Sequence, residues 1–123
     1  MKLSTTEEVL MNHLWTLEKA FMKDLLDAYD PPKPAATTLA TLLKRMTDKG
    51  FVAYREFGNS REYYPVIARE AYFAKHVNGL IRNFFNNSAA QFASFFTKET
   101  DMSAKELEEL RALIDQQIEK KKG

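Results

Sequence analysis

The sequence predicts a mainly α protein, an α+β winged helix-turn-helix in which a three-helix core carries a β-hairpin wing and two C-terminal helices follow. Three observations support this fold class. A helix-spaced apolar stripe occupies residues 39–46, two strand-like runs joined by a Gly-Asn-Ser loop follow it, and an aromatic-rich segment begins after Pro65. A helix followed by a basic hairpin is the order expected of a winged helix-turn-helix.

The first helix is predicted to begin near residue 6. Ser4 and Thr5 precede Glu7 and Glu8 at the spacing of a capping box, in which side chains satisfy the first backbone donors of a helix. Its apolar line is expected to consist of Leu10, Leu14 and Leu17, with Trp15 beside it.

A second short helix is predicted over residues 21–29. The prolines that follow, in the stretch 30–34, remove backbone donors and force the preceding residues out of the α region. Because Pro34 is tolerated at a helix start, the third helix is expected immediately after the break.

The third helix should bury the stripe of Leu39, Leu42, Leu43 and Met46 and end at Gly50. Its opposite face has short hydroxyl side chains and two cations near its far end. Such a face can approach DNA closely, with short side chains reaching base edges in the major groove and Lys or Arg holding phosphate. The residues of this face are Thr37, Thr38, Ala40, Thr41, Lys44 and Arg45.

The predicted wing consists of strands over residues 51–57 and 61–64. Gly58, Asn59 and Ser60 form the loop and are expected to supply the positive φ angles of a short turn. Arg55 and Arg61 alternate with aromatic residues along the strands. An ordinary edge hairpin protected by charged residues is the alternative interpretation.

A single long helix is predicted over residues 70–96, and a last helix is predicted from Ser103, with Glu106 completing a capping box. Together they carry more apolar surface than they can hide against each other, so we expect them to be dimerisation helices of an intertwined homodimer; a monomer with a helical cap is the alternative. Residues 1–66 would then be the DNA-binding domain and residues 67–123 the dimerisation region. The expected interface residues are Phe73, Val77, Leu80, Ile81, Phe84, Phe92, Phe95, Phe96, Leu107, Leu110 and Ile114.

The amino-acid composition further narrows the class of protein and the kinds of site it can contain. Of the 123 residues none is Cys, which excludes disulfides and thiolate metal sites, and residues 33–64 hold six basic and three acidic side chains. The N-terminus lacks a signal-peptide core and no run approaches the ~18 apolar residues of a membrane span, so a cytoplasmic protein is expected.

Catalytic and metal sites have no candidates in the sequence. His13 and His76 are the only histidines and neither has a ligand at i+4, so we expect no metal, no cofactor and no enzymatic activity.

The chain resembles the penicillinase and methicillin-resistance repressor family, which also includes copper-responsive repressors. Ser4, Thr5, Glu8, Val9, Met11, Leu14 and Trp15 carry the likeness in the first helix. The segments 37–46 and 49–52 carry it in the recognition helix, and 63–65, 101–103 and 108–110 carry it in the wing and tail. The resemblance implies a homodimer that binds a palindromic operator in double-stranded DNA. It places the operator contacts on Ala36, Thr37, Thr38, Thr41, Lys44 and Arg45, backed by Arg55 and Arg61 from the wing.

The sequence departs from the family pattern in three places. Members that respond to β-lactams are cleaved by a regulatory protease at an Asn–Phe bond, and the matching positions here are Phe95 and Phe96. Copper-responsive members use Cys-x-Cys motifs, which this chain lacks. Ala35 stands where relatives often carry a Ser helix cap. Because alanine has no hydroxyl, the helix loses ~1 kcal/mol of capping stabilisation.

The leading hypothesis is therefore a homodimeric transcriptional repressor, relieved by an antibiotic or another stress signal. A winged-helix protein–protein interaction module without specific DNA readout is the main alternative. A third hypothesis is a regulator that senses a small molecule in a pocket among Tyr72, Phe84 and Phe92.

Overall fold

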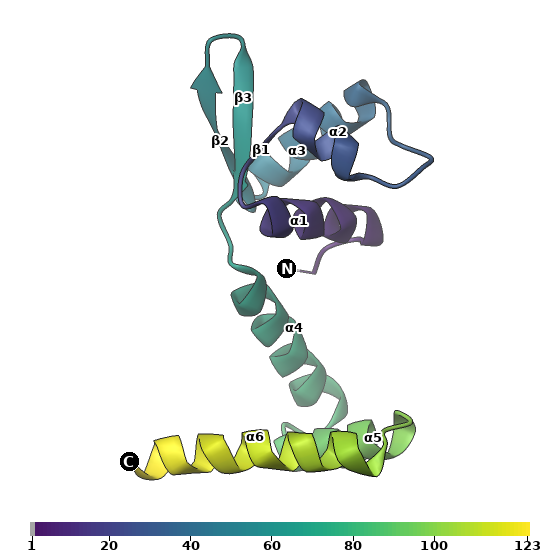
Figure 1. Cartoon of the computed structure of the whole chain (residues 1–123), viewed down its shortest axis with the longest axis vertical. Helices are drawn as coiled ribbons and strands as arrows, with labels where there is room; N and C mark the ends of the chain where they lie inside the picture. The colour runs from purple at the N-terminus through teal and green to yellow at the C-terminus, as the bar shows by residue number, and fades with distance from the viewer. Residues whose placement is uncertain (1) are drawn as a thin grey trace. The chain divides into compact units, whose positions relative to one another are not determined.

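The computed structural model describes residues 2–123, which contain six helices and a three-stranded antiparallel sheet (Figure 1). They fall into two compact units, the first ending at His76 and the second spanning Val77–Gly123. The first unit holds α1 (Thr5–Leu17), β1 (Ala20–Phe21), α2 (Met22–Ala28), α3 (Ala36–Asp48), β2 (Val52–Phe57), β3 (Ser60–Pro65) and the start of α4 (Arg69–Phe84). The rest of α4, α5 (Ala89–Glu99) and α6 (Ala104–Lys122) belong to the second.

The element order of the first unit confirms the winged helix-turn-helix fold class. Three helices precede a hairpin that projects beyond them (Figure 1). None of the helices found in residues 2–123 has both the length and the apolarity needed to cross a membrane.

Helix α1 begins as the sequence predicts, because Ser4 and Glu7 form a capping box at its N-terminus. Leu10 and Leu14 of the predicted apolar line are buried, but Leu17 is exposed: it lies in the last turn, where Glu18 adopts φ 70° and the chain turns away. Met11 is fully buried and belongs to the core instead.

Strand β1 is not predicted by the sequence. It consists of Ala20 and Phe21, which pair with Tyr63 and Glu62 of β3 and add a third strand to the hairpin in the order β1-β3-β2. Two residues are too few to show an alternating pattern. Helix α2 starts directly after them, with the Asp24 carboxylate accepting a hydrogen bond from the backbone N–H of Phe21 at 2.9 Å.

Helix α3 buries the predicted stripe of Leu39, Leu42, Leu43 and Met46. Its N-cap, Ala35, makes no side-chain hydrogen bond, as expected from the missing hydroxyl. The helix is followed by Gly50 at φ +84°, a left-handed conformation that glycine adopts without steric cost.

The hairpin has the predicted strands with a shorter loop. Phe57 pairs with Ser60, so only Gly58 and Asn59 connect the strands. Gly58 has φ +60°, whereas Asn59 and Ser60 do not have the positive φ that the sequence suggested. Ser60 belongs to β3 because its pairing with Phe57 closes the ladder.

The predicted single helix over residues 70–96 is wrong, because α4 ends at Phe84 and α5 begins at Ala89. Asn86 and Asn87 both adopt left-handed φ angles, 53° and 58°, which asparagine tolerates better than most residues. Ser88 then caps α5 by accepting a hydrogen bond from the N–H of Gln91. The C-terminal part therefore has three helices rather than two, and α6 starts with the predicted box of Ser103 and Glu106.

Replacing Gly50 isolates the conformational requirement at the end of α3. No atom lies within 4 Å of the position a Cβ would take, so Gly50→Ala adds no clash. We expect it to lower the free energy of unfolding by about 1–2 kcal/mol, since only the left-handed backbone is penalised. Gly50→Asn should cost less. Urea denaturation of both variants tests this, and equal losses would contradict the assignment.

Candidate nucleic-acid interface

The exposed face of α3 carries a single row of polar side chains. Thr37, Thr41, Lys44 and Asp48 follow one another at intervals of four, three and four residues, which places them on one line along a helix. All four are exposed, and the buried stripe lies on the opposite side. The predicted contacts Ala36, Thr38 and Arg45 are exposed as well. Every predicted contact of this helix therefore lies on accessible surface.

Three side chains of this row, those of Thr41, Lys44 and Asp48, already have partners within α3. The Thr41 hydroxyl donates to the carbonyl of Thr37 at 3.1 Å, and Lys44 Nζ lies 3.1 Å from Asp48 Oδ2. Both members of the ion pair are largely exposed, and such pairs contribute about 0.3–0.5 kcal/mol. Lys44 can therefore exchange Asp48 for a phosphate at little cost.

The flank of α3 that faces α1 is organised by Glu7. Glu7 Oε2 accepts hydrogen bonds from Arg45 Nε at 3.2 Å and from Lys49 Nζ at 2.6 Å, and Oε1 accepts from the backbone N–H of Ser4 at 2.9 Å. The Glu7 side chain is only 3% exposed, whereas that of Arg45 is 51% exposed. One buried carboxylate thus joins the start of α1 to the end of α3.

The partners of Glu7 favour its charged form. The hydrogen bond from Lys49 and that from the backbone N–H of Ser4 lower the pKa of Glu7 from 4.5 to about 2, although burial acts in the opposite direction. The carboxylate is therefore ionised at neutral pH.

The other flank of α3 faces the hairpin across a cleft of about 400 Å³. The Arg61 guanidinium lies over the Tyr54 ring, 4.3 Å from its centre, and Tyr54 in turn packs against Tyr63. A cation held on an aromatic face keeps its charge while losing freedom. The cleft is lined by Ala40, Lys44, Thr47, Asp48, Tyr54, Arg61 and Tyr63.

Arg55 lies on the other face of the hairpin from Arg61. Arg55 pairs with Glu62, and Glu56 pairs with Arg61, so the alternation of side chains along the strands separates the two arginines. Only Arg61 shares the cleft with Lys44. The two predicted wing contacts are thus both exposed but not on one surface.

Three residues of this surface escape sequence reasoning. Glu7 is recognisable as a capping residue, but its ion pairs reach 38 and 42 residues along the chain, and no local pattern predicts them. Asp48 has a local signal, since it follows Lys44 by four residues. Tyr54 is visible only as one of several alternating aromatics.

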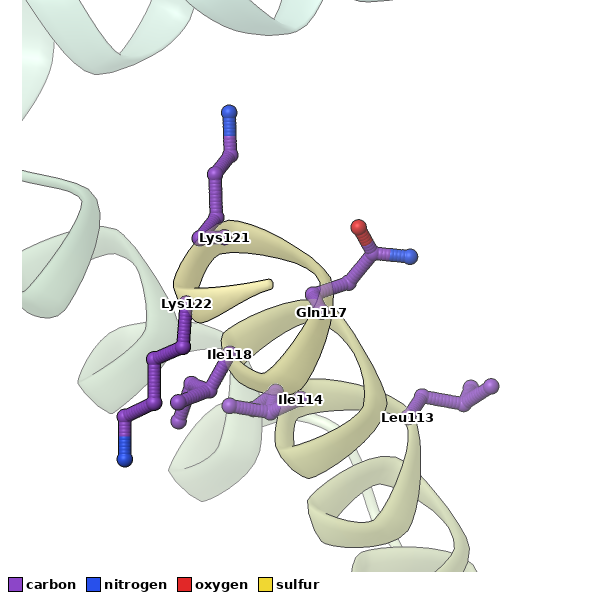
Figure 2. A pocket seen from close by; sticks show the side chains of 6 residues that line it. All are labelled: Leu113, Ile114, Gln117, Ile118, Lys121 and Lys122. Atoms are coloured by element: carbon purple, nitrogen blue, oxygen red, sulfur yellow. The ribbon is translucent and has the colours of Figure 1, made fainter.

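The second unit lacks a buried core. No side chain of Val77–Gly123 is buried, whereas the core of the first unit contains fourteen buried hydrophobic residues. On α6, Ile114 and Ile118 lie beside each other on one side of the helix, and Leu113 also projects from it (Figure 2). The exposed large hydrophobic residues of this unit are Phe84, Phe95, Phe96, Leu107, Leu113, Ile114 and Ile118.

The other predicted interface residues lie in two settings. Val77, Leu80, Ile81, Phe92 and Leu110 are half-buried. Phe85, which adjoins the set, packs edge-on against Phe92 and tilted against Phe95, so residues 85–96 form an aromatic cluster. Phe73 belongs to the first unit, where it packs against Trp15 and Tyr72.

Tyr72, one of the residues of the hypothetical sensing pocket, is buried in the first unit. Its hydroxyl accepts a hydrogen bond from the backbone N–H of Leu3 at 3.0 Å, while Phe84 is 74% exposed in the second unit. The pocket stays a prediction.

Comparison with known proteins finds a family and relatives that match nearly the whole chain. The family described as "Penicillinase repressor" matches residues 3–116. The methicillin resistance regulatory protein MecI of Staphylococcus aureus (strain N315) is 23% identical over 115 residues, covering 93% of this chain and 94% of that protein. MecI of Mammaliicoccus sciuri is 22% identical over the same shares. A solved structure of the CopR repressor is similar with a TM-score of 0.47 and 22% identity, over 55% of this chain and 99% of that one.

The lowered pKa of Glu7 makes part of the stability depend on pH. The folded protein holds the carboxylate ionised, so this contribution is complete above about pH 5 and is lost as the pH falls toward about 2. The shift in the pKa of Glu7 corresponds to a contribution of about 3 kcal/mol to the free energy of unfolding at neutral pH. We expect Glu7→Gln to lower the free energy of unfolding at pH 7, and the difference from wild type to shrink with acidification. Urea denaturation across this range measures it.

Glu8→Gln serves as the control, because Glu8 is adjacent and partly exposed. Its difference from wild type should stay small at every pH. A Glu7→Gln difference that does not change between neutral and acid pH would contradict the account.

Proposed function

The chain belongs to the penicillinase repressor family, whose members are non-enzymatic transcriptional regulators, and from that premise we propose that it is a homodimeric repressor occupying a palindromic operator in cytoplasmic DNA. The polar face of α3, exposed opposite a fully buried stripe, is the observation that carries the proposal. An exposed helix face of this width fits the major groove, which admits one α-helix.

Each part of the surface has a role that its chemistry supports. Thr37, Thr38 and Thr41 are short enough to reach base edges, by hydroxyl hydrogen bonds or by methyl contact with thymine. Lys44 and Arg61 line one cleft between α3 and the wing, so both can hold the phosphate backbone beside the groove. Arg55 reaches DNA only from the far face of the wing.

A second copy of the chain would supply the apolar surface against which the C-terminal unit can bury its side chains. The unit exposes Phe84, Phe95, Ile114 and other large apolar side chains and buries none, and fully burying each would contribute about 1.5–3 kcal/mol. Two identical subunits related by a twofold axis present two recognition helices, which suits half-sites about 34 Å apart. Dimerisation therefore accounts for the exposed apolar surface, and a twofold dimer leads to the proposal of a palindromic site.

Release from DNA is a separate step. Phe95 and Phe96 lie inside α5, so a regulatory protease acting between them would require α5 to unfold locally first. Repression as proposed does not depend on this cleavage.

Operator binding is tested with duplexes from the region upstream of the gene. Fluorescence anisotropy at several salt concentrations should give log affinity falling linearly with log salt, with a slope near −0.9 for each phosphate contact. Binding that does not depend on salt, or that shows no preference for any palindrome, would overturn the proposal. A monomer that binds only another protein would support the interaction module instead.

Substitutions of Lys44 and Thr38 are expected to change DNA binding in different ways. Lys44→Ala should weaken operator and scrambled duplexes by a similar factor and reduce the salt slope by about one contact, because phosphate carries no sequence information. Thr38→Ala should change the preference among operator variants by about fivefold or more. Competition binding on single-base operator variants distinguishes them; equal effects on all sequences would refute the role of Thr38.

The dimer is tested by placing a charge on the apolar side of α6. Ile114→Glu should raise the dimer dissociation constant by at least about a hundredfold, since a charge would be buried without a partner. Sedimentation velocity over a concentration series measures this. Gln116→Glu adds the same charge two residues away, at an exposed polar position, and should leave the dimer intact. An unchanged Ile114→Glu dimer would exclude α6 from the interface.

A further inference from the structure

The Arg45 side chain is held by a hydrogen bond at one edge of its guanidinium group. Among the residues 2–123, the side chain of Arg45 makes a single hydrogen bond, from Nε to Glu7 Oε2 at 3.2 Å. A guanidinium group is a planar fork with five N–H donors, and the terminal nitrogens carry four of them. A bond at Nε therefore fixes the plane of the group while its outer donors remain available.

Glu7 is a rigid anchor for this bond. Its side chain is 3% exposed, and its other oxygen is held by the backbone N–H of Ser4 at 2.9 Å, so the carboxylate cannot rotate without breaking the capping box of α1. An exposed acid such as Asp48 has no comparable restraint.

Lys49 balances the charge of Glu7. Its Nζ is the closer cation, at 2.6 Å against 3.2 Å for Arg45, and its side chain is 30% exposed against 51%. With two cations on one carboxylate, the cluster keeps a net positive charge. That charge is carried outward by Arg45, the more exposed of the two.

We propose that Glu7 is a positioning residue for DNA recognition, which acts by holding the Arg45 guanidinium with its terminal nitrogens directed to the operator. The inference rests on the proposed function, because it needs Arg45 to contact DNA. Glu7 itself, being buried, does not touch the duplex. Its effect on the operator passes through Arg45, whereas Lys49 neutralises the carboxylate.

A double-mutant cycle tests this. Operator and scrambled-duplex affinities are measured for wild type, Glu7→Gln, Arg45→Ala and the double variant, at a temperature where circular dichroism shows all four folded. We expect Glu7→Gln to lower operator affinity about tenfold without lowering affinity for scrambled DNA, since a lost negative charge favours phosphate. In the Arg45→Ala background, Glu7→Gln should not lower operator affinity any further.

A structural role alone would give a different result. If Glu7 only stabilised the fold, its substitution would weaken operator binding by the same factor with or without Arg45, or weaken both duplexes equally; either outcome overturns the inference. Glu8→Gln removes the same charge and is the matched control; it should lower neither affinity. Wild-type protein that fails to bind any operator would instead overturn the proposed function.

Arg45→Lys provides a second test that does not disturb Glu7. Lysine keeps the charge but lacks the planar fork, so this variant should retain the salt slope and lose discrimination between operator and scrambled DNA by about fivefold or more. Discrimination equal to that of wild type would overturn the inference even if Glu7→Gln does not fold.

Discussion

The placement of α3 depends on one buried carboxylate. Glu7 serves two elements at once, because one of its oxygens caps α1 through Ser4 and the other binds the cations at the end of α3. A buried charge is stable only when it is paired and hydrogen-bonded, so α1 and α3 cannot shift independently. At the other end of α3, Lys33 donates to the carbonyls of Leu26, Asp27 and Tyr29 and so closes α2 before the helix-turn-helix break. The apolar stripe of α3 fixes which side faces the core, and these charges fix where the helix lies.

The two units differ in how their apolar side chains are satisfied. In the first unit, the apolar stripe of α3 is buried against α1, α2 and the sheet. The buried hydrophobic residues of this unit range from Leu3 to Tyr72. The second has well-capped helices, with Ser88 and Ser103 as N-caps, but no buried side chain. Capping stabilises a helix locally, whereas burial of an amphipathic face supplies most of its stability in a folded protein. The helices of the second unit thus have defined ends and an unsatisfied surface, the combination expected of an interface.

Local patterns predicted most of the fold and which residues of the candidate surface on α3 are exposed. The spacing of Leu39, Leu42, Leu43 and Met46 determined which face of α3 is buried, and hence that its threonines are exposed. The continuous helix over residues 70–96 was wrong because apolar periodicity continues across Asn86 and Asn87, whose backbone conformation, rather than their polarity, ends α4. Strand β1 depends on pairing with β3, and the Glu7 cluster depends on residues about forty positions apart. Both are products of tertiary contact and leave no local signature.

The basic residues of the proposed DNA surface all have acidic neighbours, and burial decides which of these can be displaced. Lys44 faces Asp48 in a largely exposed pair, and Arg61 lies opposite Glu56 on the wing. Phosphate can replace such exposed partners, since their interaction is weak in water. Glu7 differs from these acids, because its carboxylate is buried and is also held by Lys49 and by the backbone N–H of Ser4. In the proposed complex the exposed acids would therefore moderate attraction to DNA in general, and the buried acid would fix the geometry of one arginine. On this proposal, affinity depends on Lys44 and Arg61 with their exposed acids, and sequence preference depends on Arg45 with the buried Glu7.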